Sequence, residues 1–213
     1  MTDIAVLGSG TVGTSLALGL ARAGHTVLIG TSRPERAPSG ELREAGVRLT
    51  THASAVEPAD VVFNTTPGEL SVDILRPLEP QLRGRILVDV SNAHVRSPEG
   101  FPAAPVYPES SLAEELQKAL PRTRVVKSLN TMDSRVMINP SVLPVPATAC
   151  VSGDDAGAKE TLVGLLRDLG WKDEWILDLG GLYNARAQEW VVLMLGPFVT
   201  RHGLVPFSLA IVH

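Results

Sequence analysis

The chain has 213 residues, of which 44% are hydrophobic and 20% charged, a composition typical of one globular domain or of one domain with a small addition. A formal net charge of −4 leaves no basic surface for nucleic-acid phosphates, and 4% aromatic residues are too few for base-stacking platforms. The single cysteine, Cys150, excludes an internal disulfide and cysteine-rich zinc sites, and it favours a reducing compartment.

The sequence shows no targeting or membrane signal. The N-terminus has no basic segment followed by an apolar run. The most apolar stretch, 190–200, has about 11 residues, whereas a membrane span needs about 20. We therefore expect a cytoplasmic protein with no membrane or nucleic-acid partner. Whether His213 is the natural C-terminus is left open.

Apolar runs and helical repeats alternate along the first 130 residues. Short apolar runs predict strands at 4–7, 27–29, 47–49, 61–63, 86–90 and 125–128. Helical spacing predicts helices at 11–23, 53–57, 69–82 and 112–120, and four prolines predict a loop at 97–110. This alternation predicts a Rossmann-like α/β fold, a doubly wound parallel sheet with helices on both faces.

The pattern changes after Asn130. Residues 132–145 are rich in proline and predicted to be irregular, followed by a strand at 147–151 and a helix at 154–169 capped by Asp154. A further strand is predicted at 175–179 and an apolar helix at 184–200. We therefore expect a Rossmann domain over 1–130 and a small C-terminal α/β lobe over 131–213.

A glycine-rich turn joins the first strand to the first helix. It consists of Gly8, Ser9, Gly10, Thr11, Val12 and Gly13. In a dinucleotide-binding turn the first glycine makes the tight turn, the second lets the backbone approach a pyrophosphate, and the third lets the helix pack on the strand. The helix N-terminus then faces the phosphate with free N–H groups. Because this turn has the required strand and helix on either side, it predicts a dinucleotide site.

The end of the second strand indicates which dinucleotide is bound. NAD-binding folds place an acidic residue there to hold the ribose 2′-hydroxyl. This chain instead has Thr31, Ser32, Arg33 and Arg36. Hydroxyls and guanidinium groups suit a 2′-phosphate, so we expect NADP(H) as the cofactor.

Three further polar clusters follow predicted strands. Because the carboxyl ends of parallel strands meet at one edge of the sheet, where open α/β sheets bind ligands, we expect them to lie together. The first two would hold ribose, phosphate or the nicotinamide amide, and the third would form the nicotinamide and acceptor pocket. The clusters are Thr65, Thr66 and Pro67 after Asn64; Ser91 and Asn92; and Asn130, Thr131 and Met132.

No catalytic dyad or metal-ligand pattern stands out. His25, His52 and His202 lack partners at metal or triad spacing, so no metal is predicted, and His94 lies near the ligand edge as a loop residue. Asp89 is read as structural. Lys127 with Asn130 resembles a pair used on carbonyl substrates, but Lys127 lies on a strand and not on a long helix.

Several of these segments together resemble one family, the NADP oxidoreductases dependent on coenzyme F-420, a 5-deazaflavin. The resemblance covers nearly the whole chain, and its more specific parts are 151–155 and 178–186. The segments that carry it are the glycine loop 8–13, Gly30-Thr31-Ser32-Arg33, Asn130-Thr131, Val151-Ser152-Gly153-Asp154-Asp155 and Asp178-Leu179-Gly180-Gly181-Leu182-Tyr183-Asn184-Ala185-Arg186.

The resemblance implies NADP(H) along the Rossmann edge and a small C-terminal lobe that closes over the nicotinamide. Hydride would pass directly between nicotinamide C4 and deazaflavin C5, a transfer that needs stacking and orientation more than a side-chain acid. Deazaflavin enzymes carry a histidine and a proline near the position of Asn130-Thr131-Met132, and this chain has neither. An Asn-Thr pair occurs in the reductase domain of membrane metalloreductases, which pass hydride to a flavin.

The acceptor is therefore expected to be a deazaflavin or a flavin. Two alternatives remain open: an NADPH-dependent reductase of a small imine, carbonyl or hydroxy acid, and a non-enzymatic NADP sensor. Families of the first kind carry a long helical C-terminal domain, which this chain lacks. The apolar stretches 191–195 and 207–212 further predict a homodimer, because a small lobe hides so much apolar surface with difficulty.

Overall fold

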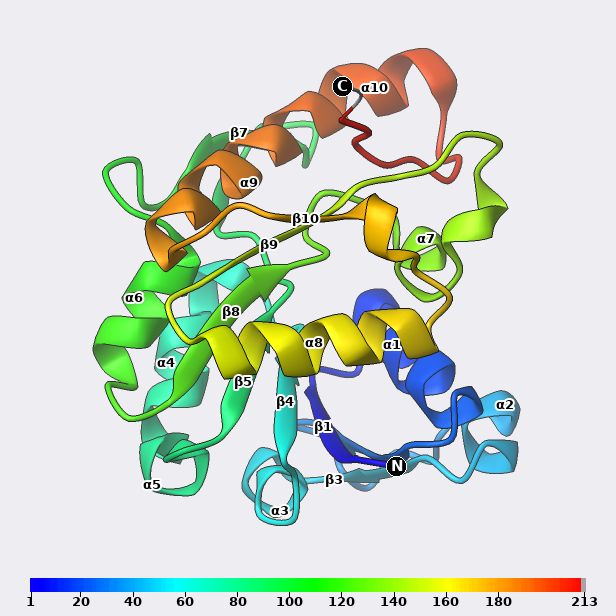
Figure 1. Ribbon diagram of the computed structural model, residues 1–213, viewed down its shortest axis with the longest axis vertical. Helices are drawn as coiled ribbons and strands as arrows, with labels where there is room; N and C mark the ends of the chain where they lie inside the picture. Colours follow the sequence, from blue (N-terminus) through cyan, green and yellow to red (C-terminus); the bar gives the residue numbers. More distant parts are fainter. Residues whose placement is uncertain (212–213) are drawn as a thin grey trace.

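The computed structural model describes residues 1–211 and contains one sheet of eight strands (Figure 1). The strand order is β10-β9-β8-β5-β4-β1-β2-β3. Its strands are β1 (Asp3–Leu7), β2 (Thr26–Gly30), β3 (Arg48–Thr50), β4 (Val61–Asn64), β5 (Ile86–Asp89), β8 (Arg124–Ser128), β9 (Ala149–Gly153) and β10 (Ile176–Asp178). The order places β1 in the interior, with the chain winding outward on both sides, so the predicted Rossmann-like α/β class is confirmed.

The two C-terminal strands run against the others. The pairs from β3 to β8 are parallel, whereas β9 pairs antiparallel with β8, Val126 facing Gly153. β10 pairs parallel with β9. The expectation of a parallel sheet is corrected at this point, since residues 131–148 join the end of β8 to the start of β9 at the same edge of the sheet, without the crossover that a parallel strand needs. Segment 131–211 thus adds its strands to the same sheet, and a domain boundary at residue 130 stays a prediction.

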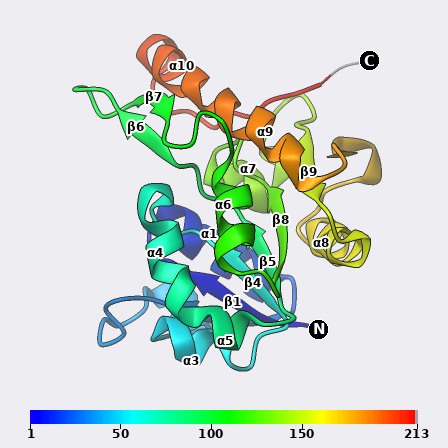
Figure 2. The same cartoon turned by 90° about the vertical axis from the view of Figure 1, so that its left-hand side faces the viewer.

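Helices cover both faces of the sheet. Figure 2 shows α8 on one side of β8 and the group α4 to α6 on the other. The buried clusters divide the helices in the same way. One face holds α1 (Thr11–Arg22), α2 (Gly40–Glu44), α7 (Ser134–Ile138) and α8 (Ala156–Asp168), and the other holds α3 (His52–Val56), α4 (Ser71–Leu75), α5 (Glu79–Leu82) and α6 (Leu112–Ala119).

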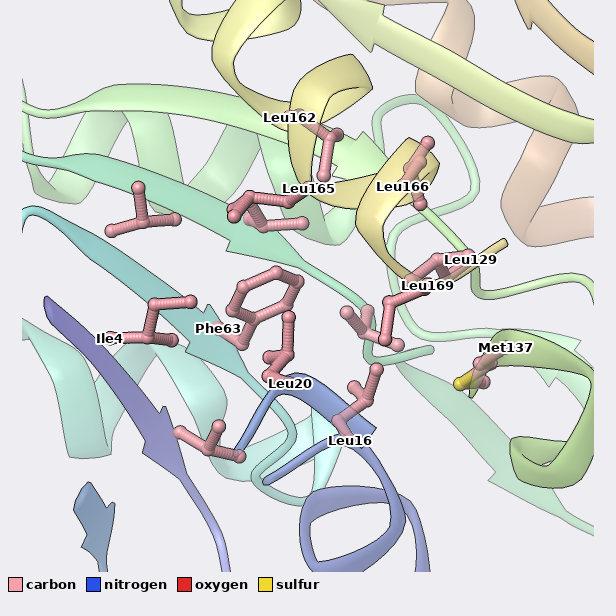
Figure 3. Packing of buried hydrophobic residues seen from close by; sticks show 14 of the residues in the cluster. Ile4, Leu16, Leu20, Phe63, Leu129, Met137, Leu162, Leu165, Leu166 and Leu169 are labelled. Atoms are coloured by element: carbon pink, nitrogen blue, oxygen red, sulfur yellow. The ribbon is translucent and has the colours of Figure 1, made fainter. Parts of the chain in front are cut away.

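The core on the α1 side joins the first and last parts of the chain. Phe63 of β4 lies between leucines of α1 and α8 in Figure 3. Leu16, Leu20 and Leu162 are fully buried there. Each such side chain contributes about 1.5–3 kcal/mol relative to an exposed position. Burial of the α8 leucines therefore attaches the C-terminal segment firmly to the Rossmann sheet.

Two local predictions were wrong. The predicted loop 97–110 contains β7 (Pro102–Pro105), which forms an antiparallel hairpin with β6 (His94–Arg96). This two-stranded ribbon tolerates its prolines because all of its positions are at an edge. The cap of α8 is Asp155, which accepts from the backbone N–H of Ala158 at 2.7 Å. Asp154 instead accepts from the N–H of Leu182 at 2.9 Å.

The predicted helix 184–200 is interrupted in its middle. It consists of α9 (Ala185–Val191), a 3-10 turn (Val192–Met194) and α10 (Leu195–His202). Pro197 has no N–H for the preceding turn, which accounts for the break. In Figures 1 and 2 this run lies at the end of the molecule opposite the N-terminus. None of the helices within residues 1–211 is long and apolar enough to cross a membrane.

Candidate functional site

The glycine turn has the tight geometry that the sequence predicted. Gly8 has a φ of 118°, and its N–H donates to the carbonyl of Gly30 at 2.8 Å. A Cβ on Gly8 would lie 2.7 Å from the carbonyl oxygen of Thr65, and a Cβ on Gly13 would overlap the carbonyl oxygen of Gly8. Both positions require glycine, because the turn and α1 are packed directly on the ends of β1 and β4.

The second glycine differs from its neighbours. Apart from Gly10 and its two chain neighbours, residues 1–211 place no heavy atom within 4 Å of the position that a Cβ on Gly10 would take. Gly10 is the N-cap of α1, and no side chain of the described chain caps this end. The free N–H groups of the first turn of α1 therefore face an open surface. Such a surface fits a pyrophosphate, since phosphate needs both the donors and the space.

A hydroxyl pair joins the glycine turn to the end of β2. Ser9 Oγ and Thr31 Oγ1 lie 2.9 Å apart, and the backbone N–H of Arg33 donates to Thr31 Oγ1 at 3.2 Å. Thr31 is buried, whereas the side chains of Arg33 and Arg36 are exposed, as is that of Ser32. Thr31 thus orients the loop that carries the cations.

A pocket of about 240 Å³ lies beside this loop. Ser9, Thr14 and Arg36 line it together with apolar side chains of β2, α2 and β3. It combines an apolar wall with a cation at its mouth, which suits an adenosine that carries a phosphate. Arg36 lies on the pocket wall and Arg33 lies outside it.

A second, larger cleft lies at the carboxyl ends of the strands. Its volume is about 450 Å³. It brings together residues of the glycine turn and of the three polar clusters that follow the predicted strands after Phe63, Val90 and Ser128, but none from the end of the second strand. These lining residues are Val12, Thr65, Thr66, Pro67, Ser91, Asn92, Asn130 and Met132. Thr131 is buried and lies outside the lining. The opposite wall comes from the β6–β7 hairpin and the C-terminal segment, with Phe101, Val192, Leu195 and Phe207.

Asn130 is aimed into this cleft by an unusual backbone. The preceding residue, Leu129, has a φ of 62°, a left-handed conformation that costs an L residue about 1–2 kcal/mol. Asn130 Nδ2 donates to Asn92 Oδ1 at 2.8 Å and to the carbonyl of Gln188 at 3.1 Å. Asn130 Oδ1 is buried and accepts no hydrogen bond from residues 1–211. Its capacity as an acceptor is therefore unused within residues 1–211.

Three titratable groups line the cleft near the hairpin. His94 and Arg96 come from β6, and Glu69 comes from the segment after β4. Burial lowers the pKa of His94 below its ordinary value, the Arg96 charge lowers it further, and Glu69 opposes both. His94 Nδ1 is buried without a hydrogen-bond partner in residues 1–211. This wall is therefore polar at one end and apolar at the other.

A buried charged cluster beneath the cleft was missed by the sequence analysis. Lys127 Nζ lies 2.7 Å from Asp89 Oδ2 and 2.8 Å from Glu189 Oε1, and all three side chains are buried. Burial disfavours the ammonium, but the two carboxylates outweigh it and raise the pKa of Lys127. Burial raises the pKa of Glu189, although Lys127 opposes it. Charged residues inside the apolar strands 86–90 and 125–128 were the available signal, because such positions need a charged partner.

The segment 178–186, which carried much of the resemblance, has a structural role. Asp178 accepts from the N–H of Gly180 at 2.8 Å, and Asn184 Nδ2 donates to the carbonyl of Leu179 at 2.5 Å. Arg186 forms two hydrogen bonds of 2.8 Å to Glu114 of α6. These contacts fix the start of α9, which places Gln188 beside Asn130 and Glu189 beside Lys127.

The chain is similar to known proteins in sequence and in fold. Residues 3–93 match the family described as NADP oxidoreductase, coenzyme F420-dependent. The F420-dependent NADP reductase of Methanothermobacter marburgensis is 30% identical over 207 residues, which cover 90% of each chain. The chain belongs to this oxidoreductase family.

Other family relatives differ in length. A crystal structure from Arthrobacter sp. FB24, assigned provisionally as an F420-dependent NADP reductase, is 35% identical and matches with a TM-score of 0.91 over 100% of both chains. The rat metalloreductase STEAP3 is 30% identical over 194 residues, which cover 91% of this chain and 37% of that protein. This family member thus spans less than half the length of the metalloreductases it matches.

Proposed function

We propose that this protein is an NADP(H)-dependent oxidoreductase that transfers hydride between the nicotinamide and a deazaflavin or flavin acceptor. The observation that carries the proposal is the cleft at the strand ends, where the buried Asn130 Oδ1 accepts no hydrogen bond from residues 1–211. Family membership supports the choice of NADP and of a deazaflavin, because the relative from Methanothermobacter marburgensis, which aligns over 90% of its length, is named for both.

Separate groups of residues bind the two ends of the dinucleotide. The first turn of α1, reached over the open Gly10, binds the pyrophosphate. The exposed cations Arg33 and Arg36, with Ser32, bind the 2′-phosphate at the end of β2. Asn130 Oδ1 accepts from the carboxamide of the nicotinamide. When bound, NADPH supplies a hydride from C4 of its nicotinamide.

The rest of the cleft orients the two rings. Met132, Val192 and Leu195 present apolar surface from both walls, which excludes water and lets flat rings stack. Hydride transfer between stacked rings requires position and orientation and no side-chain nucleophile. The cleft accordingly needs no catalytic dyad. The flavin alternative rests on the Asn130-Thr131 pair, which resembles that of the metalloreductases, and the two acceptors share a fused three-ring system.

The proposal is tested by mixing purified protein and NADPH with four acceptors in turn: the deazaflavin, flavin mononucleotide, riboflavin and a small cyclic imine. We expect NADPH oxidation with the deazaflavin or a flavin, and none with Gly10→Val protein as a control. Turnover of the imine alone would favour a small-substrate reductase. Tight NADPH binding without turnover on any acceptor would favour a sensor.

A further inference from the structure

Lys127 is held in a fully saturated set of hydrogen bonds below the cleft. Its ammonium lies 2.7 Å from Asp89 and 2.8 Å from Glu189, and it donates a third hydrogen bond to the carbonyl of Ser91. An ammonium has three N–H donors, so each of them has a partner here. The Lys127 side chain is fully buried. It therefore touches no ligand, and any functional effect must act through its neighbours.

Stability alone explains this cluster poorly. Removing charges from water costs much of what their mutual attraction returns, and well-packed apolar residues are often as stable in such positions. β5 and β8 are otherwise apolar between their ends, and apolar side chains at 89 and 127 would continue that pattern. What the charged cluster adds is a set of directed hydrogen bonds to the loops of the cleft.

Asp89 links the first two loops of the cleft. Its Oδ1 accepts from Asn64 Nδ2 at 2.8 Å and from the N–H of Ser91 at 3.2 Å. Asn64 Oδ1 in turn accepts from the hydroxyl of Thr66 at 2.7 Å. Lys127 holds the other end of the Ser91 peptide through its carbonyl. The turn at Ser91 and Asn92 is thus fixed on both sides.

The same turn controls the third loop. Asn92 Nδ2 donates to the carbonyl of Asn130 at 2.9 Å, and Asn130 Nδ2 donates back to Asn92 Oδ1. Glu189 connects the C-terminal segment to Lys127, and it also accepts from the N–H of Leu112 at 2.9 Å. The adjacent carbonyl of Gln188 accepts from Asn130. Ser91 of the strand-end loops and Glu189 of the C-terminal segment therefore both contact the buried ammonium of Lys127.

We propose that Lys127 is a positioning residue which, with Asp89 and Glu189, holds the Ser91–Asn92 turn and Asn130 in the geometry that binds the nicotinamide end of the dinucleotide. This proposal rests on the proposed function. The adenosine end is held elsewhere, by the glycine turn and the loop after β2, which make no hydrogen bond to this cluster within residues 1–211. Loss of Lys127 should therefore affect one half of the dinucleotide only.

The test compares two ligands by calorimetric titration. NADPH spans both halves of the site, whereas adenosine 2′,5′-bisphosphate carries the adenosine and the 2′-phosphate without the nicotinamide. We expect Lys127→Met to weaken NADPH binding by about tenfold or more, the effect of losing at least one charge-assisted hydrogen bond. The bisphosphate should bind as it does to the wild type. Lys118→Met, which removes an exposed lysine of α6, is the matched control and should change neither affinity.

A second variant tests the proposal if Lys127→Met does not fold. If Lys127→Met is unfolded by circular dichroism, the triple variant Lys127→Met, Asp89→Leu, Glu189→Met removes all three charges together and should show the same split between the ligands. An unchanged NADPH affinity, or equal losses for both ligands, would overturn the positioning role. A wild-type protein that binds neither ligand would refute the proposed function itself, and this proposal with it.

Discussion

Asn92 and Asn130 hold each other from opposite loops of the cleft. Asn130 Nδ2 donates to Asn92 Oδ1 at 2.8 Å, while Asn92 Nδ2 donates to the main-chain carbonyl of Asn130 at 2.9 Å. Asn130 Nδ2 also donates to the carbonyl of Gln188, so its donors are used within the protein. Asn130 Oδ1 remains as a buried acceptor without a partner in residues 1–211. Asn130 therefore has no spare donor, and the only hydrogen bond that its side chain can add is one that Oδ1 accepts.

The glycine turn predicts opposite effects at two of its glycines. Gly10→Val should leave the protein folded and abolish NADPH binding, because its side chain would occupy open space that the pyrophosphate needs. Gly13→Ala should instead lower the free energy of unfolding by about 1–3 kcal/mol, the usual cost of overpacking, since its Cβ meets the backbone of Gly8. Chemical denaturation and NADPH titration of both variants measure these effects. Unchanged NADPH affinity in Gly10→Val would refute the assignment of the turn.

The sequence predicted the parts of the fold that depend on local pattern. The six strands of the large sheet up to residue 128 and the glycine turn lie where apolar runs and glycine spacing placed them. The direction of β9 could not be predicted, because an apolar run has the same appearance in a parallel and an antiparallel pair. The hairpin of β6 and β7 was missed because Pro102 and Pro105 indicate a loop unless the edge position is known.

The loop after β2 predicts a preference for NADPH over NADH. One charge-assisted hydrogen bond to the 2′-phosphate is worth about 1.5–3 kcal/mol, so Arg33→Ala should weaken NADPH by roughly 10- to 150-fold and leave NADH nearly unchanged. Arg36→Ala and Ser32→Ala should give smaller losses in the same direction. Because both arginines are exposed, the preference should shrink as salt is raised.

Titrations of both nucleotides at low and high salt separate two outcomes. If Arg36→Ala alone loses affinity for NADPH, the NADP assignment stands, and the 2′-phosphate binds in the pocket that Arg36 lines. Equal affinity of the wild-type protein for NADH and NADPH at low salt would contradict the NADP assignment.

The C-terminal segment predicts a homodimer. Trp190, Met194 and Leu204 are 47%, 65% and 85% exposed, and they lie on or beside the run from α9 to α10. The predicted apolar tail 207–212 ends at Val212, which lies outside the described residues. Pairing about a two-fold axis is the commonest way to cover such a surface. Sedimentation at micromolar concentration should give twice the monomer mass, and Met194→Glu should shift it toward the monomer. A wild-type protein that sediments only as a monomer contradicts the dimer.

The contact between Glu114 and Arg186 predicts a loss of stability in acid. The Arg186 guanidinium lowers the pKa of Glu114 below its ordinary value of 4.5. A carboxyl whose pKa is lowered by folding stabilises the protein above its unfolded pKa, and the stabilisation is lost as the pH falls through the lower, folded pKa. The wild-type free energy of unfolding should therefore decrease as the pH drops below about 4.5. Glu114→Gln should reduce this decrease by up to about 1 kcal/mol. Identical pH profiles for the two proteins would exclude the contribution.

The candidate site was predicted in its outline and not in its support. Residues at strand ends could be placed at one edge from topology, because parallel strands share their direction. The reciprocal pairing of Asn92 with Asn130 depends on the left-handed backbone at Leu129, which the sequence does not indicate. The partnership of Lys127 with Glu189 joins residues 62 positions apart through the docking of α9. Such contacts follow from tertiary packing and cannot be read from spacing.

The central claim, direct hydride transfer beside Asn130, is tested most directly with NADPH deuterated at C4. Stopped-flow reduction of the deazaflavin or flavin should show a primary isotope effect, and with the deazaflavin the label should appear at ring C5. Asn130→Ala should lower the rate without unfolding the chain, since it removes the acceptor for the nicotinamide and two hydrogen bonds at the cleft while leaving the hydrophobic core intact. The account predicts transferred label and a slower Asn130→Ala protein. No transfer from NADPH to deazaflavin, flavin mononucleotide or riboflavin would contradict it.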